Sequence, residues 1–391
     1  MKILYLSSPY FADCDFPLVR QFQKMGHDVT YLIMLDPYSL KSTLFNIRRQ
    51  IPENGIIPAI WYPELKVYES YLDMSKIFIA NYTAKKRSSF QALKMSLKIA
   101  KLIRNGNYDI VHTDCMLGMW NLMFYTLFGN KMVLTVHDPF PHTGEESVRK
   151  AFNYKQAMRK VKHFVLLNSK QKDEFCDKYH LRQDRVLVNR LGFYDCVQTF
   201  IKNPVMLDSS KSHNVLFFGR ISPYKGVEYL CQAMVKVRKA VPDATLTIAG
   251  GGKMYFDITQ YKELDWVNVI NRYVGIEELA GLLQDSAISV CPYTDATQSG
   301  VIMTSYGMHR PVVASNVGGL SEMVQDGKTG LLVPPKEVDA LADAIITLLN
   351  DDEKRLGMQN YIKTEYFDGD NSWKSIAEKY IGLYKSVQQS Q

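Results

Sequence analysis

The sequence predicts an α/β protein made of two domains, each built on a parallel β-sheet that helices cover on both faces. Short runs rich in β-branched residues alternate with segments of helical periodicity in both halves of the chain, which is the pattern of a doubly wound sheet. The 391 residues are enough for two separate cores, since a domain usually has about 100–200 residues. Residues 191–213 lack clear periodicity and contain Pro204, so we expect the hinge between the domains there.

Residues 1–195 are expected to form the first domain. Its strands are predicted at residues 3–7, 29–34, 109–112, 131–137 and 163–167, and its first helix at residues 17–25. Residues 41–105 interrupt the alternation and mix aromatic with basic side chains. Within them, residues 88–103 fit a basic amphipathic helix, because apolar side chains recur on one side and three lysines fall opposite. Such a helix could lie on a membrane, or it could pack on its own sheet.

Residues 205–368 are expected to form the second domain, and residues 369–391 a closing helix that packs back on the first. The predicted strands are residues 215–218, 244–249, 267–270, 288–291, 312–314 and 330–333. The predicted helices are residues 227–240, 276–283, 304–308, 338–350 and 372–387. Strands and helices alternate more regularly here than in the first half.

Composition and cysteine usage indicate a globular protein of a reducing compartment. Hydrophobic residues make up 46% of the chain and charged residues 22%, and the six cysteines are scattered without a CxxC pair. They are typical of reduced thiols and not of a disulfide or zinc framework. Apolar stretches fall short of the roughly 20 residues that span a bilayer, and residues 1–9 look like a first strand and are too short for a signal peptide. We therefore expect a cytoplasmic protein, at most peripheral on the inner face of the cell membrane.

Charge is unevenly distributed along the chain. Residues 1–204 hold 29 basic and 18 acidic residues, a net charge of +11, whereas residues 205–391 hold 18 and 22, a net charge of −4. A basic first half suggests an anionic partner, such as a membrane surface or a phosphate-bearing acceptor. The alternative is that these are ordinary solvated faces. No nucleic-acid partner is expected.

Two cations follow the predicted strand at residues 215–218. Gly219 allows a sharp turn at the end of that strand, Arg220 and Lys225 frame the loop, and a helix is expected from residue 227. A strand, a basic loop and a helix together form the arrangement that holds a phosphate in many α/β proteins. The simpler alternative is a connecting loop with two solvated cations.

A second polar loop follows the predicted strand at residues 288–291. It runs from Pro292 to a helix whose first amides are expected near Ser299, Gly300 and Val301. The unpaired N–H groups and the dipole of a helix start favour an anion or sugar hydroxyls. Thr297 and Gln298 could select the orientation of a hydroxyl by hydrogen bonding. Capping of an ordinary helix would explain Ser299 but not the whole polar run.

Together with residues 310–324, these loops resemble the donor-binding domain of retaining family 4 glycosyltransferases, which have the GT-B fold. The resemblance covers residues 214–333 and includes Gly-Arg-x-x-x-x-Lys-Gly, Ala-Gly-Gly-Gly and Pro-Val-Val-Ala-Ser-Asn-Val-Gly-Gly. The first half agrees more loosely at residues 1–6, 25–29, 109–112 and 135–138. Residues 373–384 resemble the closing helix of the family. The implied fold has two Rossmann-like domains that face a central cleft.

The resemblance implies roles for individual residues. Arg220 and Lys225 would neutralise the donor diphosphate as the sugar–phosphate bond breaks, which lets diphosphate leave without a metal. His137 would face the donor sugar, although a satisfied histidine at a strand end is the alternative. The other implied donor-binding residues are Gly219, Gly251, Arg272, Tyr273, Asp295, Thr297, Gln298, Ser299, Gly300, Val301 and Thr304. No cofactor or metal is expected, and the nucleoside diphosphate sugar is a co-substrate.

Two departures from the family pattern affect the site. The family has two glutamates eight positions apart, and their places are taken here by Ala296 and Thr304, in a variant that reads Ala-Thr-Gln-Ser-Gly-Val. Gln298, Ser299 and Thr304 would then have to replace the carboxylate contacts to sugar and ribose hydroxyls. The first βα loop also lacks the family's Gly-Gly pair, and Asp13 or Asp15 could orient an acceptor hydroxyl there.

The predicted function is transfer of a sugar from a nucleoside diphosphate sugar to a hydroxyl of a glycan or lipid-linked saccharide, with retention, in cell-surface polysaccharide biosynthesis. The missing glutamates keep open a second hypothesis, a catalytically silent protein that only binds nucleotide sugars. A nicotinamide-dependent Rossmann enzyme is a third. The absence of a GxGxxG run with an acidic residue about 20 positions further on argues against it.

Overall fold

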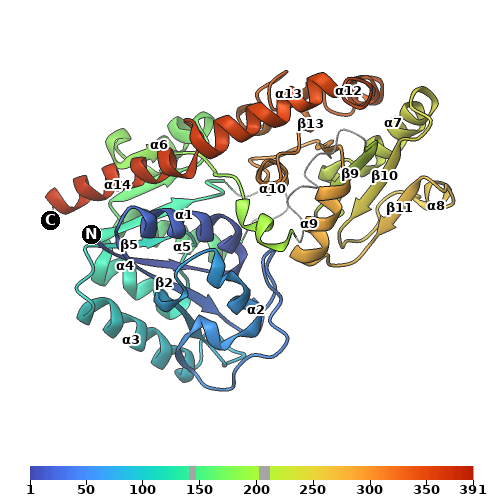
Figure 1. Ribbon diagram of the computed structural model, residues 1–391. Helices are drawn as coiled ribbons and strands as arrows, with labels where there is room; N and C mark the ends of the chain where they lie inside the picture. Colours follow the sequence, from blue (N-terminus) through green and yellow to red (C-terminus); the bar gives the residue numbers. More distant parts are fainter. Residues whose placement is uncertain (141–146, 202–211, 391) are drawn as a thin grey trace. The chain divides into compact units, whose positions relative to one another are not determined.

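The computed structural model describes residues 1–140, 147–201 and 212–390 and divides the chain into two compact units (Figure 1). Unit 1 comprises Met1–Leu191 and Trp373–Gln391, and unit 2 comprises Gly192–Ser372. The hinge expected at residues 191–213 begins where the first segment of unit 1 ends, and its residues 202–211 lie outside the described part of the chain.

Unit 1 is built on an eight-stranded sheet in the order β3-β4-β2-β1-β5-β6-β7-β8. All neighbours are parallel except β3, which runs antiparallel to β4. The strands are β1 (Lys2–Ser7), β2 (Asp28–Leu35), β3 (Gly55–Pro58), β4 (Ile77–Asn81), β5 (Ile110–Thr113), β6 (Met132–Val136), β7 (His163–Leu166) and β8 (Val186–Val188). The central strands are buried on both faces, which is why their sequences read as continuous apolar runs.

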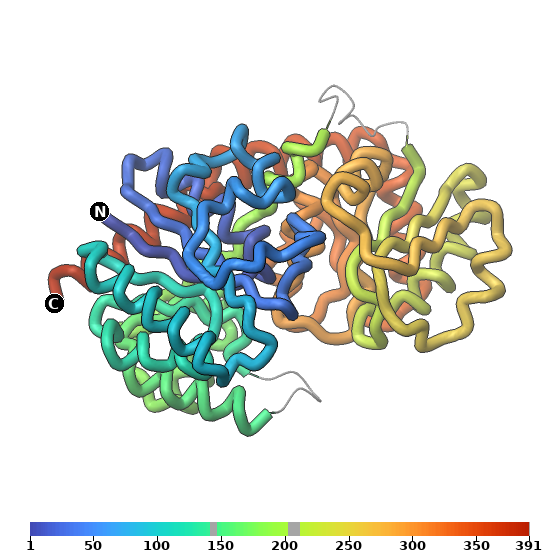
Figure 2. Tube along the Cα trace, turned by 90° about the horizontal axis from the view of Figure 1, so that it is seen from below, coloured from blue at the N-terminus to red at the C-terminus, as the bar shows by residue number. Residues whose placement is uncertain are grey.

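Helices cover both faces of this sheet. They are α1 (Ala12–Lys24), α2 (Pro63–Lys66), α3 (Phe90–Asn105), α4 (Met123–Phe128), α5 (Val148–Lys160), α6 (Lys172–Tyr179) and α14 (Trp373–Gln389). Leu4 and Leu6 of β1 pack into the hydrophobic core formed with α3, α4, α5 and α6. Tyr5, between them, faces the opposite side of the sheet, because successive strand side chains alternate. The last helix, α14, packs against α1 in unit 1 and ends near the amino terminus in both views (Figures 1 and 2).

The basic amphipathic helix predicted at residues 88–103 is confirmed as α3. Ser89 accepts a hydrogen bond from the backbone N–H of Ala92 and so caps its first turn. Ile99 and Ile103 are fully buried against the sheet, while the three lysines on the other side are exposed. The helix therefore packs on its own sheet. None of the helices in the described ranges is both long and apolar enough to cross a membrane.

Unit 2 contains a six-stranded parallel sheet in the order β11-β10-β9-β12-β13-β14. Its strands are β9 (Asn214–Phe218), β10 (Thr245–Ala249), β11 (Val267–Ile270), β12 (Ile288–Cys291), β13 (Val312–Ser315) and β14 (Gly330–Val333). Its helices are α7 (Val227–Ala240), α8 (Thr259–Lys262), α9 (Ile276–Asp285), α10 (Gly300–Gly307), α11 (Leu320–Met323), α12 (Val338–Asn350) and α13 (Asp352–Ile362). The order is that of a Rossmann sheet. The prediction of two α/β units with parallel-rich sheets is therefore confirmed.

Three elements differ from the sequence prediction. The helix expected from residue 17 already begins at Ala12, so Asp13 and Asp15 lie in its first turn and not in a loop. Carboxylates are favourable there because the helix dipole is positive at its start. Pro17 lies inside the helix, beyond the first turn, and has no backbone N–H to donate there. The helix predicted to begin near Ser299, Gly300 and Val301 agrees, since it starts at Gly300. In residues 41–105 the short strands β3 and β4 were missed.

Glycines allow the loops of unit 2 to pack closely. Gly226 has φ +65°, and a Cβ there would lie 1.9 Å from the carbonyl oxygen of Pro292. Gly318 has φ +47°, and a Cβ there would lie 1.8 Å from the carbonyl oxygen of Ala296. Both the left-handed backbone and the short distance exclude a side chain. The connections after β9, β12 and β13 are thereby held against one another.

Replacing Gly226 by alanine is expected to destabilise unit 2 more than replacing Gly327. Both glycines have positive φ, +65° and +75°, so both substitutions carry a strain of about 1–2 kcal/mol. Only at Gly226 would the new Cβ also meet backbone, because nothing lies within 4 Å of a Cβ at Gly327. Urea unfolding followed by circular dichroism should show a further loss of about 1–3 kcal/mol for Gly226→Ala. Equal losses in the two variants would contradict close packing of the loops.

Candidate active site

The two predicted loops of unit 2 leave the sheet at its switch point. Strand β9 lies between β10 and β12, so the chain winds outward in opposite directions from it. Ligands of such sheets bind at the carboxyl ends of the strands, beside this point. The loop after β9 carries Arg220 and Lys225, and the loop after β12 leads to α10. The topology therefore brings together two segments that are about 70 residues apart in the sequence.

Specific contacts join these two loops. The backbone N–H of Thr294 donates to the carbonyl oxygen of Tyr224 at 2.8 Å. The Nζ of Lys225 lies 3.6 Å from the centre of the Tyr293 ring. A Cβ on Gly219 would lie 3.4 Å from Cγ2 of Val301, in the first turn of α10. The basic loop and the helix start thus form one surface.

Lys225 is partly buried, and its charge is poorly compensated. Burial lowers the pKa of its ammonium group to about 8, Cys291 acts in the opposite direction, and the charge of Arg220 lowers it further. The ring face of Tyr293 offers the ammonium a weak electrostatic partner. Within the described ranges, no carboxylate forms an ion pair with Arg220 or Lys225. An anion bound here would stabilise both cations.

The glycine turn after β10 lies against the basic loop. The N–H of Ile221 donates to the carbonyl oxygen of Gly251 at 3.1 Å. A Cβ on Gly251 would lie 3.4 Å from the carbonyl carbon of Arg272 and 3.5 Å from the nitrogen of Tyr273. Arg272 is exposed and forms two 2.7 Å contacts with the Glu278 carboxylate. Gly251, Arg272 and Tyr273 thus follow neighbouring strands at the same edge as the basic loop.

Two hydroxyls at the start of α10 point inward. Ser299 is buried, and its hydroxyl donates to the hydroxyl of Tyr293 at 3.3 Å. Thr304 is buried too, and its hydroxyl donates to the carbonyl oxygen of Gly300 at 2.8 Å. Both side chains are thus hydrogen-bonded within unit 2, and their role in replacing the missing glutamates stays a prediction.

Among the polar side chains of the same loop, Asp295 is exposed, and Thr294, Thr297 and Gln298 are partly exposed. The predicted ones among them are Asp295, Thr297 and Gln298. Ala296, at the other glutamate position, is buried, and its carbonyl oxygen accepts the N–H of Gly319 at 3.1 Å. Asp295, Thr297 and Gln298 are further candidates for contacts with sugar or ribose hydroxyls.

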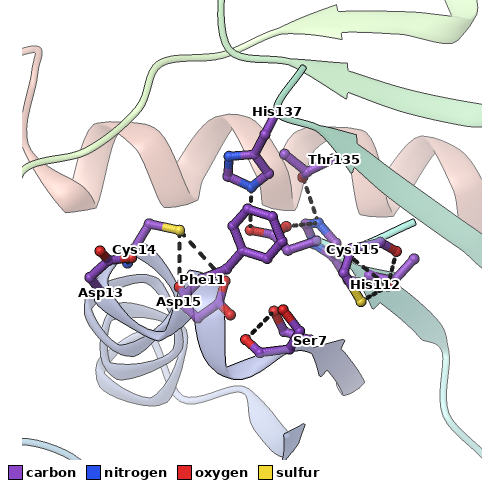
Figure 3. Close-up of polar contacts among 12 residues, drawn as sticks. Ser7, Phe11, Asp13, Cys14, Asp15, His112, Cys115, Thr135 and His137 are labelled. Carbon is purple, nitrogen blue, oxygen red and sulfur yellow. Dashed lines mark hydrogen bonds and ion pairs between the residues drawn. The ribbon is translucent and has the colours of Figure 1, made fainter. Parts of the chain in front are cut away.

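In unit 1 the corresponding switch point lies at β1, between β2 and β5. His137 follows β6 and lies close to Asp114, which follows β5. His137 Nε2 is 3.2 Å from Asp114 Oδ2, and the ring of Phe11 stacks on the imidazole at a centroid distance of 4.2 Å (Figure 3). The His137 side chain is 11% exposed. It is held in place by a carboxylate at one edge and an aromatic ring on one face.

His137 also lines a cavity of about 930 Å³ in unit 1. Most of the wall is apolar or aromatic, and Lys150 and Lys178 supply positive charge. A second cavity of about 510 Å³ shares Phe11 and Lys150 with the first and adds Arg87 and further polar groups. The two cavities provide room and hydrogen-bonding groups for a saccharide next to the histidine.

The aspartates of α1 have different environments. Asp15 is fully buried, and its carboxyl group accepts hydrogen bonds from Tyr31 at 2.8 Å and Tyr5 at 3.2 Å. Asp15 is therefore not exposed to an acceptor, which corrects the prediction made for it. Asp13 is partly exposed, and burial raises the pKa of its carboxyl to about 6 against the opposing effect of a hydrogen bond with Thr43. Asp13 stays the candidate for orienting an acceptor hydroxyl.

Asp114 was not singled out from the sequence, although it stands two residues after a predicted strand and directly after the observed β5. Burial raises the pKa of its carboxyl, but the neighbouring imidazoles of His112 and His137 outweigh burial and hold the pKa well below its usual range. Burial, and then the charge of Asp114, raise the pKa of Asp15 well above the usual range. Asp114 thus carries the negative charge, and Asp15 stays neutral.

One set of side chains in the described ranges has metal-ligand chemistry: the donor atoms of Cys14, Asp114 and His137 lie within 4.8 Å of one another. Burial raises the pKa of the Cys14 thiol well above its usual range, and the thiol donates to the carbonyl oxygen of Phe11 at 3.1 Å. A zinc site would need the thiolate. These contacts fit a hydrogen-bonded cluster better than a set of metal ligands.

The comparisons with known families agree with this geometry. Residues 212–351 match the family described as glycosyl transferases group 1, and residues 17–192 match glycosyltransferase family 4. Each unit of the chain thus matches a glycosyltransferase family, unit 1 family 4 and unit 2 group 1. Similar curated proteins include an alpha-D-kanosaminyltransferase of Streptomyces kanamyceticus, 28% identical over 51% of this chain and 54% of the relative. A D-inositol 3-phosphate glycosyltransferase of Corynebacterium urealyticum is 30% identical over 44% of this chain and 42% of the relative. The matched part spans about half the length of such relatives.

Solved glycosyltransferase structures share the fold along the whole chain. Anabaena HepE in complex with UDP and glucose has a TM-score of 0.67 at 17% identity, with 99% of this chain and all of that chain covered. The catalytic domain of starch synthase IV from Arabidopsis thaliana has a TM-score of 0.71 at 12% identity, with 100% and 99% covered. The expected GT-B fold is confirmed.

Binding of a nucleoside diphosphate is expected to weaken above about pH 8. Lys225 has its pKa lowered to about 8 by burial, so the ammonium form dominates below that pH and the neutral amine above it. A diphosphate stabilises the ammonium form, so the dissociation constant should rise by up to about tenfold per pH unit above pH 8. Titration calorimetry between pH 7 and 9 measures this with UDP, GDP, ADP and dTDP.

Lys225→Arg provides the control for this titration, because a guanidinium stays charged over the whole range. We expect its affinity to change little between pH 7 and 9. If the two proteins show the same pH dependence, Lys225 does not contact the diphosphate.

Proposed function

We propose that the chain transfers a sugar from a nucleoside diphosphate sugar to a hydroxyl of a glycan or lipid-linked saccharide, with retention and without a metal ion. The observation that carries the proposal is the surface where Arg220 and Lys225, neither of which has a carboxylate partner in the described ranges, adjoin the start of α10. Unit 2 would bind the donor. HepE, with the same fold, has been solved with UDP and with UDP-glucose, which supports this assignment.

In this reaction, unit 2 would stabilise the leaving group, the nucleoside diphosphate. The bond between the sugar C1 and the diphosphate oxygen breaks, and a bond from the acceptor oxygen to C1 forms on the same face. The acceptor proton passes to the departing phosphate oxygen. Negative charge grows on the diphosphate during this step, and the fixed cations Arg220 and Lys225 lower its free energy because they need little reorganisation.

Unit 1 would supply His137 and the acceptor site. The cavities beside His137 combine aromatic walls with the charged groups of Lys150 and Arg87, which suits a saccharide that carries a phosphate or a lipid phosphate. WaaG, with a TM-score of 0.61 at 12% identity, is a glycosyltransferase involved in lipopolysaccharide biosynthesis. A cell-surface glycan acceptor is part of the proposal on this ground.

A catalytically silent protein that binds nucleotide sugars is the second candidate. It is favoured by the buried Ala296 and the inward hydroxyl of Thr304 at the positions where the family has glutamates. Slow release of nucleoside diphosphate from UDP-, GDP-, ADP- or dTDP-sugars in the absence of acceptor separates the two candidates. Release indicates an enzyme, and binding without release would support the silent protein.

We expect Arg220→Ala and Lys225→Ala each to lower turnover by about 100-fold or more, since each removes a charge that stabilises the leaving group. The fold should persist, as neither side chain is part of the core. Lys239→Ala is the matched control, because Lys239 is exposed and lies at the other end of α7. Turnover is measured as nucleoside diphosphate release, and circular dichroism checks the fold. Unchanged kinetics in both site variants would contradict the proposed function.

A further inference from the structure

Polar side chains form a buried row across the sheet of unit 1, on the face that carries α1 and α14. The strand register places Tyr5 of β1 opposite Tyr31 of β2 on one side and His112 of β5 on the other. All three are fully buried. The centre of a parallel sheet is normally apolar, and a polar group there destabilises the fold unless it is hydrogen-bonded. The partners of these buried polar groups therefore decide whether the row stabilises the fold.

Hydrogen bonds and one ion-pair contact run from the last helix to the cavity. The hydroxyl of Tyr384, on α14, contacts Nδ1 of His112. Nε2 of His112 is hydrogen-bonded to Oγ1 of Thr135 at 2.8 Å and lies 3.1 Å from Oδ1 of Asp114, a charge contact without hydrogen-bond geometry. The other oxygen of Asp114 lies 3.2 Å from Nε2 of His137. Figure 3 shows the end of this chain, where Thr135 lies beside the imidazole of His137 and His112 lies below it.

We propose that Asp114 is the positioning residue for His137, and that Tyr384 fixes Asp114 through His112. The packing of the last helix, α14, on the sheet then controls the orientation of the His137 ring. The proposal rests on the proposed function in assigning His137 to the reaction. Its hydrogen-bond geometry is independent of that assignment.

The protonation pattern follows from the negative charge of Asp114. That charge favours a hydrogen on the nearby Nε2 of His112, which bonds Thr135, and leaves Nδ1 to accept the hydroxyl hydrogen of Tyr384. The Asp114 carboxylate then accepts the Nε2 hydrogen of His137. His137 is thereby held as the tautomer with its hydrogen on Nε2. Its unprotonated Nδ1 lies on the ring edge away from Asp114. A residue that fixes the tautomer and the orientation of a histidine in this way affects the function of the protein through that histidine.

The neighbours of Asp114 concentrate one negative charge on it. The low pKa of Asp114 and the raised pKa of Asp15 mean that the two carboxyl groups hold one proton, and Asp15 holds it. Tyr31 and Tyr5 donate to Asp15 from the opposite side. A single ionised carboxylate therefore lies between two imidazoles. Phe11 completes the arrangement by stacking on His137, which restricts rotation of the ring.

The last helix depends on the same contacts. Tyr384 and Tyr380 are buried, and the hydroxyl of Tyr380 lies 3.3 Å from Oγ1 of Thr135. Both rings also pack against Phe22 of α1, at centroid distances of 5.8 and 6.3 Å. Residues 272 positions apart in the sequence, His112 and Tyr384, thus share one hydrogen bond. Removal of the Tyr384 hydroxyl should change the orientation of the His137 ring and leave the aromatic packing intact.

The test uses three variants of the full chain: Asp114→Asn, Tyr384→Phe and the control Tyr108→Phe. Tyr108 is also buried in unit 1, and its hydroxyl bonds Thr30 at 3.1 Å, outside the row. Nitrogen-15 spectra of the labelled histidines, with His112 and His137 assigned by substitution, report the tautomer of each ring. Donor hydrolysis gives kcat and KM separately, and thermal unfolding gives stability.

We expect Asp114→Asn to change the His137 tautomer signal and to lower kcat on the order of 100-fold, with KM for the donor changed less than about threefold. Tyr384→Phe should shift the His112 signal towards the other tautomer and lower kcat by about 2- to 10-fold, the effect of one hydrogen bond. Tyr108→Phe should leave both signals and kcat unchanged, whatever it does to stability. This pattern would show that the row orients His137.

The proposal is overturned if Asp114→Asn and Tyr384→Phe lower only the unfolding temperature and leave the histidine spectra as in the wild type. If Asp114→Asn does not fold, the spectrum of Tyr384→Phe alone decides, since a phenylalanine preserves the packing. Failure of the proposed function is distinguishable, because it would appear as no donor turnover in the wild-type protein. The histidine spectra would still show whether the row sets the tautomers.

Discussion

Parallel strands bring their carboxyl ends to a single edge, and most of the candidate site depends on this constraint. In each unit the chain winds outward in both directions from one central strand, β1 or β9. The connections that leave these strands and their neighbours must therefore converge at one end of the sheet. Arg220 meets the start of α10 for this reason in unit 2. His137 meets Asp114 for the same reason in unit 1.

The two units use this edge differently. In unit 2, glycines such as Gly226 and Gly318 let backbone loops touch, and Arg220 and Lys225 have no carboxylate partners among the described residues. This half of the sequence has a net charge of −4, so the positive site is local and not a consequence of overall charge. In unit 1, the buried and ionised carboxylate of Asp114 instead contacts Nε2 of His137.

The sequence predicts unit 2 well because its inner strands β9, β10, β12 and β13 are largely buried and read as short apolar runs. Helices α7 and α12 and strands β11 and β12 begin and end at the predicted residues. The position of Lys225 beside the polar loop also follows from sequence, since both cations lie in a connection after an evident strand. Partners across the fold do not follow from the sequence: the hydroxyl of Ser299 bonds Tyr293, and the hydroxyl of Thr304 bonds the backbone of α10. Asp114 carries no local signal of its role, which appears only when β5 and β6 lie side by side.

The most direct test of the account measures the coupling between the β-phosphate and the two cations. Dissociation constants of the tightest-binding nucleoside diphosphate and of its monophosphate are compared in the wild type and in the double variant Arg220→Ala/Lys225→Ala. Charge-assisted hydrogen bonds contribute about 1.5–3 kcal/mol each, so the wild type should prefer the diphosphate by about tenfold or more. In the double variant the preference should fall below about threefold. An equal preference in both proteins would show that the cations do not bind the diphosphate and would contradict the account.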